Sequence, residues 1–365
     1  MTVVLGPDDL AALCRTVLER VGVLPTAASS VAGALVAAEC MGISSHGVAR
    51  LPQYADQAAA GKVRGDAVPR VETPLPATVR VDAGCGFAYP ALEAGLDVAA
   101  PLALRMGCAA LGVTNSHHCG VAGLHVERAA RQGLVALLFA NTPAAMAPWG
   151  GNRASLGTNP LAFACPAPVG TAADSASVMD AAGAGAHAGP DGTPGAGPEH
   201  DPLVMDLSLS TVARGKIVAA AREGKPIPEG WAVDAGGSPT TDARAALGGM
   251  LLPFGGAKGA ALALMVELLA ASLTGSNHAY EASSFLDAAG DPPRTGQCML
   301  LIAPQAFGAD FAGRAAALLG HVLDQPSTRL PGARRFELQR RAHREGVTIP
   351  WSLHQDLLRR AGGGA

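Results

Sequence analysis

Apolar residues recur at helical spacing near the start of the chain. One run, spaced three or four positions apart, consists of Leu10, Leu13, Cys14, Val17, Leu18 and Val21. Gly22 ends this run, and Gly42 ends a second helical stretch over residues 26–41. The pattern therefore predicts a helical N-terminal segment.

Strand and helix patterns alternate further along the chain. Residues 77–82 alternate like a strand, and residues 92–106 have a helical pattern in which Pro101 predicts a kink or a break. The following segments predict a buried strand, a helix and a strand, over 109–114, 122–132 and 135–140. An apolar helix of small residues follows at 255–274 and a strand at 298–303. Such alternation is typical of α/β architecture.

One long segment breaks the alternation. Residues 167–202 consist mostly of Ala, Gly, Pro, Ser and Asp, with almost no large apolar side chain. A segment of this composition cannot form a packed core, so we interpret it as a flexible insert.

Composition and charge narrow the class of protein. Apolar residues make up 49% of the 365 residues, charged residues only 16%, and the net charge is -3. Disorder of the whole chain is excluded, and without a basic excess we expect no nucleic-acid partner. The longest apolar stretch, 259–273, is short and contains Glu267, so we expect no membrane span. The first residues have no signal-peptide pattern, so we expect no signal peptide. The seven cysteines form no CxxC pair, which predicts reduced thiols in the cytoplasm.

Several common catalytic and binding motifs are absent. No GxGxxG follows a predicted strand, so the usual dinucleotide fingerprint is missing. The sequence also has no GxxxxGK[ST], HExxH or GxSxG motif, so P-loop, zinc-protease and serine-hydrolase chemistry have no starting point.

The first candidate for chemistry follows the second predicted helix. Ser45 and His46 precede Arg50, which would share a face with His46 on one helical turn. A histidine can give or take one proton near neutral pH, and an arginine binds a carboxylate at two points. This pair is what a 2-oxo acid needs. A capping serine with a histidine packed under a loop explains the same spacing equally well.

A second candidate lies between a predicted strand and a predicted helix. His117 and His118 precede Gly120, after which the first N–H groups of the helix can bind a phosphate. Adjacent histidines point apart and no further ligands stand at metal spacing, so we expect no metal. A polar loop that satisfies its own hydrogen bonds is the alternative.

Single polar residues at predicted turns complete the candidates. Thr158 can bond a substrate carboxylate or only shape its turn. Asp206 can orient a histidine, bind a ribose hydroxyl, or cap the next helix. Lys258 can meet a cofactor phosphate or extend into solvent. Gly332 lets the backbone of its turn approach a ligand closely, and Arg334 with Arg335 adds positive charge there, or the turn belongs to a solvated basic tail.

Taken together, these segments resemble a known family. The shared motifs are SSHGVARLPQY, NSHHCGVAG, MAPWGG, GTNPLAF, VMDLSLSTVARGKI, PIPEGWAVDAGGSPTTD, GGAKG and RLPGARR, in this order. They resemble the malate/L-lactate dehydrogenase family that lacks a Rossmann fold, with its 3-sulfolactate, ureidoglycolate, diketogulonate and Δ1-piperideine-2-carboxylate relatives. In that family a short link joins the GTNP strand to the MD strand, where this chain has its long insert.

The resemblance implies the fold, the reaction and the roles of residues. It implies a family-specific, non-Rossmann α/β fold, a homodimer, and NADH or NADPH as the cofactor for a small carboxylate substrate. By motif position it implies His46 as the proton donor with Ser45 beside it, and Arg50 and Thr158 as substrate-binding residues. Asp206 is either catalytic or cofactor-binding. The implied cofactor-binding residues are His118, Cys119, Gly120, Val121, Ala122, Asp206, Ser208, Lys258, Gly332, Ala333 and Arg334.

Two domains and three functions follow as expectations. We expect an N-terminal helical part over 1–85, which carries the His46 motif and packs with 305–365, and a central α/β cofactor-binding domain over 86–304. The expected reaction interconverts a 2-oxo acid and a 2-hydroxy acid of malate, lactate or sulfolactate type. A cyclic imine reductase of the Δ1-piperideine-2-carboxylate or Δ1-pyrroline-2-carboxylate type is the alternative. A catalytically inactive binding homologue is a third, against which the intact Ser45, His46 and Arg50 argue.

Overall fold

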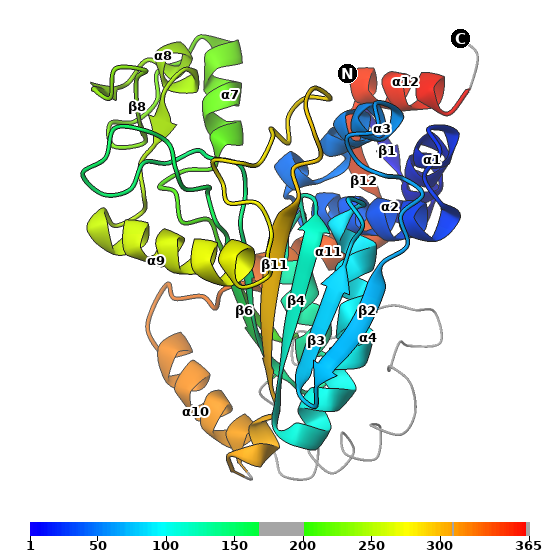
Figure 1. Cartoon of the computed structure of the whole chain (residues 1–365), viewed down its shortest axis with the longest axis vertical. Helices are drawn as coiled ribbons and strands as arrows, with labels where there is room; N and C mark the ends of the chain where they lie inside the picture. Colours follow the sequence, from blue (N-terminus) through cyan, green and yellow to red (C-terminus); the bar gives the residue numbers. More distant parts are fainter. Residues whose placement is uncertain (168–200, 309, 363–365) are drawn as a thin grey trace.

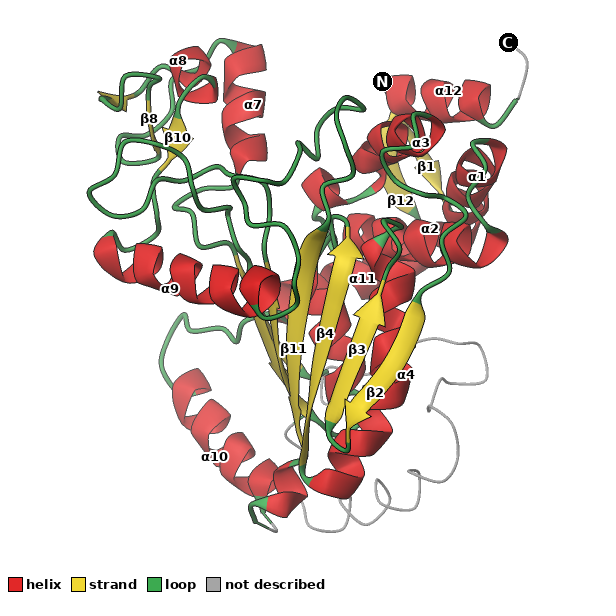
Figure 2. Ribbon diagram, viewed as in Figure 1, coloured by secondary structure: helices red, strands yellow, loops and turns green. Residues whose placement is uncertain are grey.

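A seven-stranded sheet forms the centre of the molecule (Figures 1 and 2). A computed structural model describes residues 1–167, 201–308 and 310–362, so the expected insert lies almost entirely outside the described residues. In spatial order the strands are β2 (Arg70–Leu75), β3 (Thr78–Asp82), β4 (Cys108–Ser116), β11 (Thr295–Ile302), β5 (Val135–Ala140), β6 (Leu161–Cys165) and β7 (Leu203–Leu207). The predicted α/β class is confirmed.

The sheet is mixed, because among its described strands only one neighbouring pair is parallel. β3 and β4 are parallel, while β11 runs antiparallel to both β4 and β5 and separates them. β4 and β5 therefore point the same way, with α5 (Ala122–Ala130) connecting them. The ends of β3, β4, β5 and β7 and the starts of β6 and β11 consequently meet at one edge of the sheet. The loops at this edge carry most of the candidate residues.

One face of the sheet is covered by α4 (Ala88–Met106) and α5, which share its hydrophobic core. Gly95 lets α4 approach closely, because a Cβ there would lie 2.6 Å from Leu111 Cδ1. The helix continues through Pro101, so the predicted kink or break does not end it. The other face packs against α9 (Ala257–Glu267) and the π-helical turn η5 (Leu268–Ser272).

A second lobe joins the two ends of the chain. Its helices and strands are β1 (Thr2–Leu5), α1 (Pro7–Arg20), α2 (Pro25–Cys40), α3 (Leu51–Ala59), α11 (Ala333–Glu345), β12 (Val347–Pro350) and α12 (Trp351–Arg360). β1 pairs with β12, and one hydrophobic core joins residues 10–89 to residues 342–357. β2 and β3 belong instead to the central sheet. Helix α10 (Phe311–Leu323) lies at the opposite end of the sheet from this lobe (Figure 1).

A third, smaller lobe lies beyond β7. It contains α7 (Arg214–Glu223), α8 (Ala243–Leu247) and the short strands β8 (Ala232–Val233), β9 (Pro239–Thr240) and β10 (Met250–Leu251). Its apolar residues share a core with Phe139 of β5, Cys298 of β11 and α9.

Candidate active site

The loop that carries His46 is shaped by Glu39 on α2. One carboxylate oxygen of Glu39 accepts a hydrogen bond from Ser44 Oγ, and the other accepts the N–H of Val48 at 2.9 Å. Gly47 passes so close to this carboxylate that a Cβ would collide with it. The expectation that His46 and Arg50 share one helical turn is wrong, because extended Gly47 separates two short 3₁₀ turns, η1 (Ser44–His46) and η2 (Val48–Arg50). Sequence reasoning missed Glu39.

His46 and Arg50 are nevertheless brought together with Ser45. Ser45 Oγ lies 3.0 Å from Nδ1 of His46, and Arg50 Nε donates to the carbonyl of Ser45 at 2.9 Å. A further N–H of Arg50 donates to Gln53 Oε1. Burial, then the charges of Arg50 and Arg335, lower the pKa of His46 to about 4. The imidazole is therefore neutral at pH 7 in the free protein, with two cationic groups nearby.

The two adjacent histidines have different surroundings. The ring of His118 stacks on that of His46 with centroids 5.3 Å apart, and its Nδ1 lies 2.5 Å from Tyr54 Oη. His117 points into the interior between Tyr54, Phe87 and Phe285, where neither ring nitrogen has a hydrogen-bond partner among the described residues. Burial lowers the pKa of His117 to about 3 and also lowers that of His118. Among the residues that the structure describes, no three His, Cys, Asp or Glu side chains form a metal-binding group.

Phe285 covers both histidines and is held there by buried polar groups. Its ring centroid lies 5.0 Å from that of His117 and 5.2 Å from that of His118. Lys62, of which only 2% is exposed, donates to the carbonyls of Ser284 and Ala289, at 2.7 and 2.6 Å. Gln57 Nε2 donates to the carbonyl of Phe285 itself at 3.0 Å. Sequence reasoning missed this arrangement, because a lysine normally indicates an exposed position.

Asp206 connects the end of β7 to the start of α5. Its Oδ2 accepts the N–H of Gly123 at 2.9 Å and lies 3.6 Å from a guanidinium nitrogen of Arg335. Burial raises the pKa of Asp206, although both partners favour its charged form. The alternative that Asp206 caps the next helix is wrong, because α7 begins only at Arg214. One of the N–H groups expected to be free for a phosphate is therefore already taken by this carboxylate.

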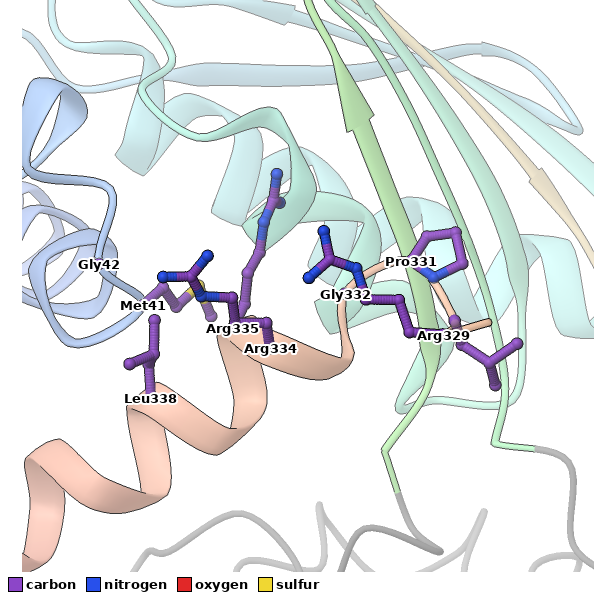
Figure 3. A pocket seen from close by; sticks show the side chains of 9 residues that line it. Met41, Gly42, Arg329, Pro331, Gly332, Arg334, Arg335 and Leu338 are labelled. Carbon is purple, nitrogen blue, oxygen red and sulfur yellow. The ribbon is translucent and has the colours of Figure 1, made fainter. Parts of the chain in front are cut away.

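An open cavity of about 380 Å³ lies beside this pair (Figure 3). Its lining is rich in arginine and consists of Met41, Gly42, Arg329, Leu330, Pro331, Gly332, Arg334, Arg335 and Leu338. Gly332 has a φ of 86°, and a Cβ there would lie 2.9 Å from the carbonyl oxygen of Val204. The turn can therefore pass this close to β7 only with glycine at this position.

Thr158 and Ser208 lie on neighbouring loops of the same sheet edge. Thr158 Oγ1 lies 3.2 Å from Thr142 Oγ1, and the carbonyl of Thr158 accepts the N–H of Leu209 at 2.9 Å. Ser208 Oγ bonds Ser210 Oγ at 2.7 Å. Further along this loop, Gly215 at the start of α7 lies next to Ser45, since a Cβ there would be 3.7 Å from that of Ser45. The loop after β7 therefore contacts Thr158 through Leu209 and Ser45 through Gly215.

Buried Glu267, at the end of α9, holds the loop of Thr158 through a hydrogen bond to Asn159. Its carboxylate accepts hydrogen bonds from Asn159 Nδ2 at 2.7 Å and from Asn141 Nδ2 at 3.3 Å. Asn159 has a φ of 39°, an unusual conformation that these bonds help to hold. The charge that interrupts the apolar run in the sequence is therefore a support for the candidate site.

Lys258 is not brought into this cluster. Lys258 lies exposed in the first turn of α9. Helix α9 itself follows the α7–α8 lobe (Figure 1). The remaining loop residues, Cys119, Val121 and Ala122, are buried at the start of α5.

In the described part of the chain, no helix is long and apolar enough to cross a membrane.

Comparison with known proteins identifies relatives along the whole chain. The family described as malate/L-lactate dehydrogenase matches residues 5–194 and 183–358. Over 345 residues, 94% of each chain, the protein is 46% identical to a Chromohalobacter salexigens protein named (2R)-3-sulfolactate dehydrogenase (NADP(+)). It is 39% identical over 355 residues, 95% of this chain and 94% of the other, to a Pseudomonas putida protein named Δ1-pyrroline-2-carboxylate/Δ1-piperideine-2-carboxylate reductase. The crystal structure of Δ1-piperideine-2-carboxylate reductase from Pseudomonas syringae pvar. tomato superposes with a TM-score of 0.86 and 36% identity, covering 98% of this chain and 100% of the other.

Proposed function

This chain belongs to the malate/L-lactate dehydrogenase family of NAD(P)-dependent oxidoreductases, and on that premise we propose that it interconverts a 2-oxo acid and a 2-hydroxy acid. The substrate is of malate, lactate or sulfolactate type, and His46 is the proton donor and acceptor. The observation that carries this proposal is the contact of His46, Ser45 and Arg50 on one loop. One group there can transfer a proton and its neighbour can hold a carboxylate.

Each side chain of the site has its own role in the proposed reaction. Ser45 Oγ is placed to bond Nδ1 of His46, which leaves Nε2 as the nitrogen that exchanges a proton with the substrate oxygen. The backbone and Gln53 hold two N–H groups of Arg50, so its remaining N–H groups can take the carboxylate, with Thr158 as a second contact. Asp206 fixes the start of α5 through Gly123 and partly balances Arg335. When bound, the nicotinamide cofactor supplies or removes the hydride at the carbon that bears the oxygen.

The cavity beside α11 fits the phosphates of this cofactor. Three arginine side chains line it, and Gly332 lets the turn that carries Arg334 pack close to β7. We assign the cofactor to the segments 118–122 and 332–334 together with Asp206 and Ser208. Lys258 does not line this cavity, so its expected role requires a separate phosphate contact of the same cofactor. Paired arginines favour a 2′-phosphate, and the relative named for NADP(+) supports the same preference.

We also propose that the protein is a homodimer in the cytoplasm. Three apolar side chains of helix α9 and of the turns after it are exposed by half or more of their surface. They are Leu264, Leu268 and Leu273. Such a face supports a homodimer that buries it. All seven cysteines are free, which supports a cytoplasmic protein.

A cyclic imine reductase is the second candidate, because the Pseudomonas putida relative carries that name. The same histidine and arginine would then serve a Δ1-pyrroline-2-carboxylate or Δ1-piperideine-2-carboxylate, whose carboxylate stands next to a C=N bond. A panel of 2-oxo acids and these two imines, measured with NADH and NADPH by cofactor absorbance, separates the candidates. Faster turnover of either imine than of every oxo acid would favour the second.

His46→Ala tests the role of the histidine. We expect kcat to fall by about 10²–10⁴, the usual range for losing a general acid, while the cofactor still binds. His321→Ala on α10, an exposed histidine outside the site, is the matched control and should keep full activity. Turnover of the His46 variant close to that of the unmodified protein would remove His46 from the mechanism.

A further inference from the structure

Three buried side chains form a chain of hydrogen bonds behind His46. Tyr89 Oη on α4 lies 3.1 Å from Tyr54 Oη on α3, which in turn lies 2.5 Å from Nδ1 of His118. Tyr54 is 0% exposed and Tyr89 1% exposed, so water does not compete for these groups. Gly120 leaves the space that Tyr89 Oη occupies, because a Cβ at this position would collide with that oxygen.

The direction of these bonds follows from counting donors. If Tyr89 donates to Tyr54, and Tyr54 donates to Nδ1 of His118, every proton in the chain has an acceptor. In the reverse direction the hydroxyl proton of Tyr89 would be buried without an acceptor, since Tyr89 has no other partner in the part of the chain that the structure describes. A buried donor without a partner is strongly unfavourable, so the first direction is favoured. Nδ1 of His118 is then the acceptor, and the ring proton is on Nε2.

The other nitrogen of His118 faces a different environment. Both ring nitrogens of His117 are sealed from solvent, whereas His118 keeps 9% of its surface exposed and its Nε2 has no hydrogen-bond partner among the described residues. The ring of His118 is held between His46, at 5.3 Å, and Phe285, at 5.2 Å. Burial and the charge of Arg50 also lower its pKa, which keeps the ring neutral. The result is a neutral ring of fixed orientation next to the proposed proton donor.

We propose that Tyr54 is a positioning residue that holds His118 in the Nε2–H tautomer, so that His118 presents a fixed N–H donor beside His46. A donor at this place would take an acceptor oxygen of a bound ligand, either the carbonyl or carboxylate of the substrate or the carboxamide of a nicotinamide. This ligand assignment rests on the proposed function. The tautomer itself does not, because it follows from the three buried side chains alone.

The tautomer can be measured in the protein labelled with ¹⁵N-histidine. Two-bond ¹H–¹⁵N correlation spectra distinguish a protonated from an unprotonated ring nitrogen, and the resonances of His118 are assigned by their loss in His118→Gln. We expect an unprotonated Nδ1 and a protonated Nε2 in the unmodified protein at pH 7. The opposite pattern, with the proton on Nδ1, would overturn the proposal.

Two matched variants separate positioning from packing. Tyr54→Phe removes the hydroxyl that bonds His118, whereas Tyr89→Phe removes a hydroxyl from the same buried chain and leaves that bond in place. We expect mixed tautomers only in Tyr54→Phe. In that variant kcat should fall about tenfold, the size expected from the loss of one oriented hydrogen bond, while Tyr89→Phe stays within about threefold of the unmodified protein.

The remaining outcomes also decide the question. Equal losses of kcat in the two variants with an unchanged tautomer would show that the tyrosines only support packing, and the proposal would fail. If none of the oxo acids or imines is turned over, the proposed function fails, and the ¹⁵N spectra still decide whether Tyr54 sets the tautomer.

Discussion

Arg50 should hold down the pKa of His46, and replacing it with glutamine tests this directly. The pKa of His46 drops from its ordinary value of 6.5 to about 4, with burial as the largest cause, Arg50 as the second and Arg335 as the third. Because Arg50 ranks behind burial, it accounts for at most about half of this drop. The pKa of His46 in Arg50→Gln should therefore rise, to no more than about 5.

Proton NMR titration of the histidine Cε1–H resonances between pH 3.5 and 8 measures this pKa, with circular dichroism at each pH to confirm that the protein is folded. Arg50→Lys is the matched control, because it keeps the positive charge and should leave the pKa near 4. A pKa in Arg50→Gln at or below that of the unmodified protein would refute the electrostatic reasoning. So would a lysine variant that titrates like the glutamine variant.

The low pKa of His46 also predicts the pH profile of the reaction. With a pKa of about 4, roughly one His46 in a thousand carries a proton at pH 7, so the free protein is a poor acid. Under the proposed function, a substrate carboxylate binds Arg50, neutralises its charge and thereby raises the pKa of His46. In the reduction direction, the pKa seen in kcat should therefore lie above the pKa seen in kcat/KM.

Three further predictions concern the supports of the site. Lys62→Met should lower the free energy of unfolding, measured by urea unfolding, by about 2–4 kcal/mol, because the carbonyls of Ser284 and Ala289 lose a buried partner. The control Lys225→Met, at an exposed position, should leave this free energy unchanged. Glu39→Gln should lower kcat and raise KM by about 5–10-fold in steady-state assays, because the loop of His46 loses a charged acceptor; unchanged constants would exclude Glu39. His117 binds no proton in the folded protein above about pH 3, whereas the unfolded chain binds one below about pH 6.5, so stability falls as pH falls through this window. His117→Phe should therefore remove about 2 kcal/mol of the loss between pH 7 and pH 5, measured by urea unfolding at both values.

The hydrophobic pattern predicted those helices and strands whose periodicity is set by one buried face. The run that ends at Gly22 and the buried strand over 109–114 are both present, as α1 and β4, because each packs on a single core. The order of the strands could not be predicted. β11 comes from far along the sequence and inserts antiparallel between β4 and β5, which depends on tertiary packing and leaves no local signal.

The charged residues that support the site could be predicted only in part. His46, Ser45 and Arg50 were singled out because their side chains suit a known chemistry, and the structure brings them together. Glu39 and Lys62 were missed, because a charged side chain in a sequence indicates exposure unless a buried partner is known. Glu267 alone gave a signal, as a charge inside an apolar helix, and its role depends on two asparagines more than a hundred residues away.

The distribution of charge around His46 connects proton transfer to ligand binding. The chain as a whole has a net charge of -3, yet Arg50 and Arg335 both act on His46, and Arg329 and Arg334 line the adjacent cavity. Asp206 lies 3.6 Å from Arg335 and balances only part of this charge. A carboxylate on Arg50 and a phosphate on Arg335 would each remove one of the charges that keep His46 unprotonated. Under the proposed function, binding of both anionic ligands therefore raises the pKa of His46 more than binding of either one alone, while burial continues to lower it.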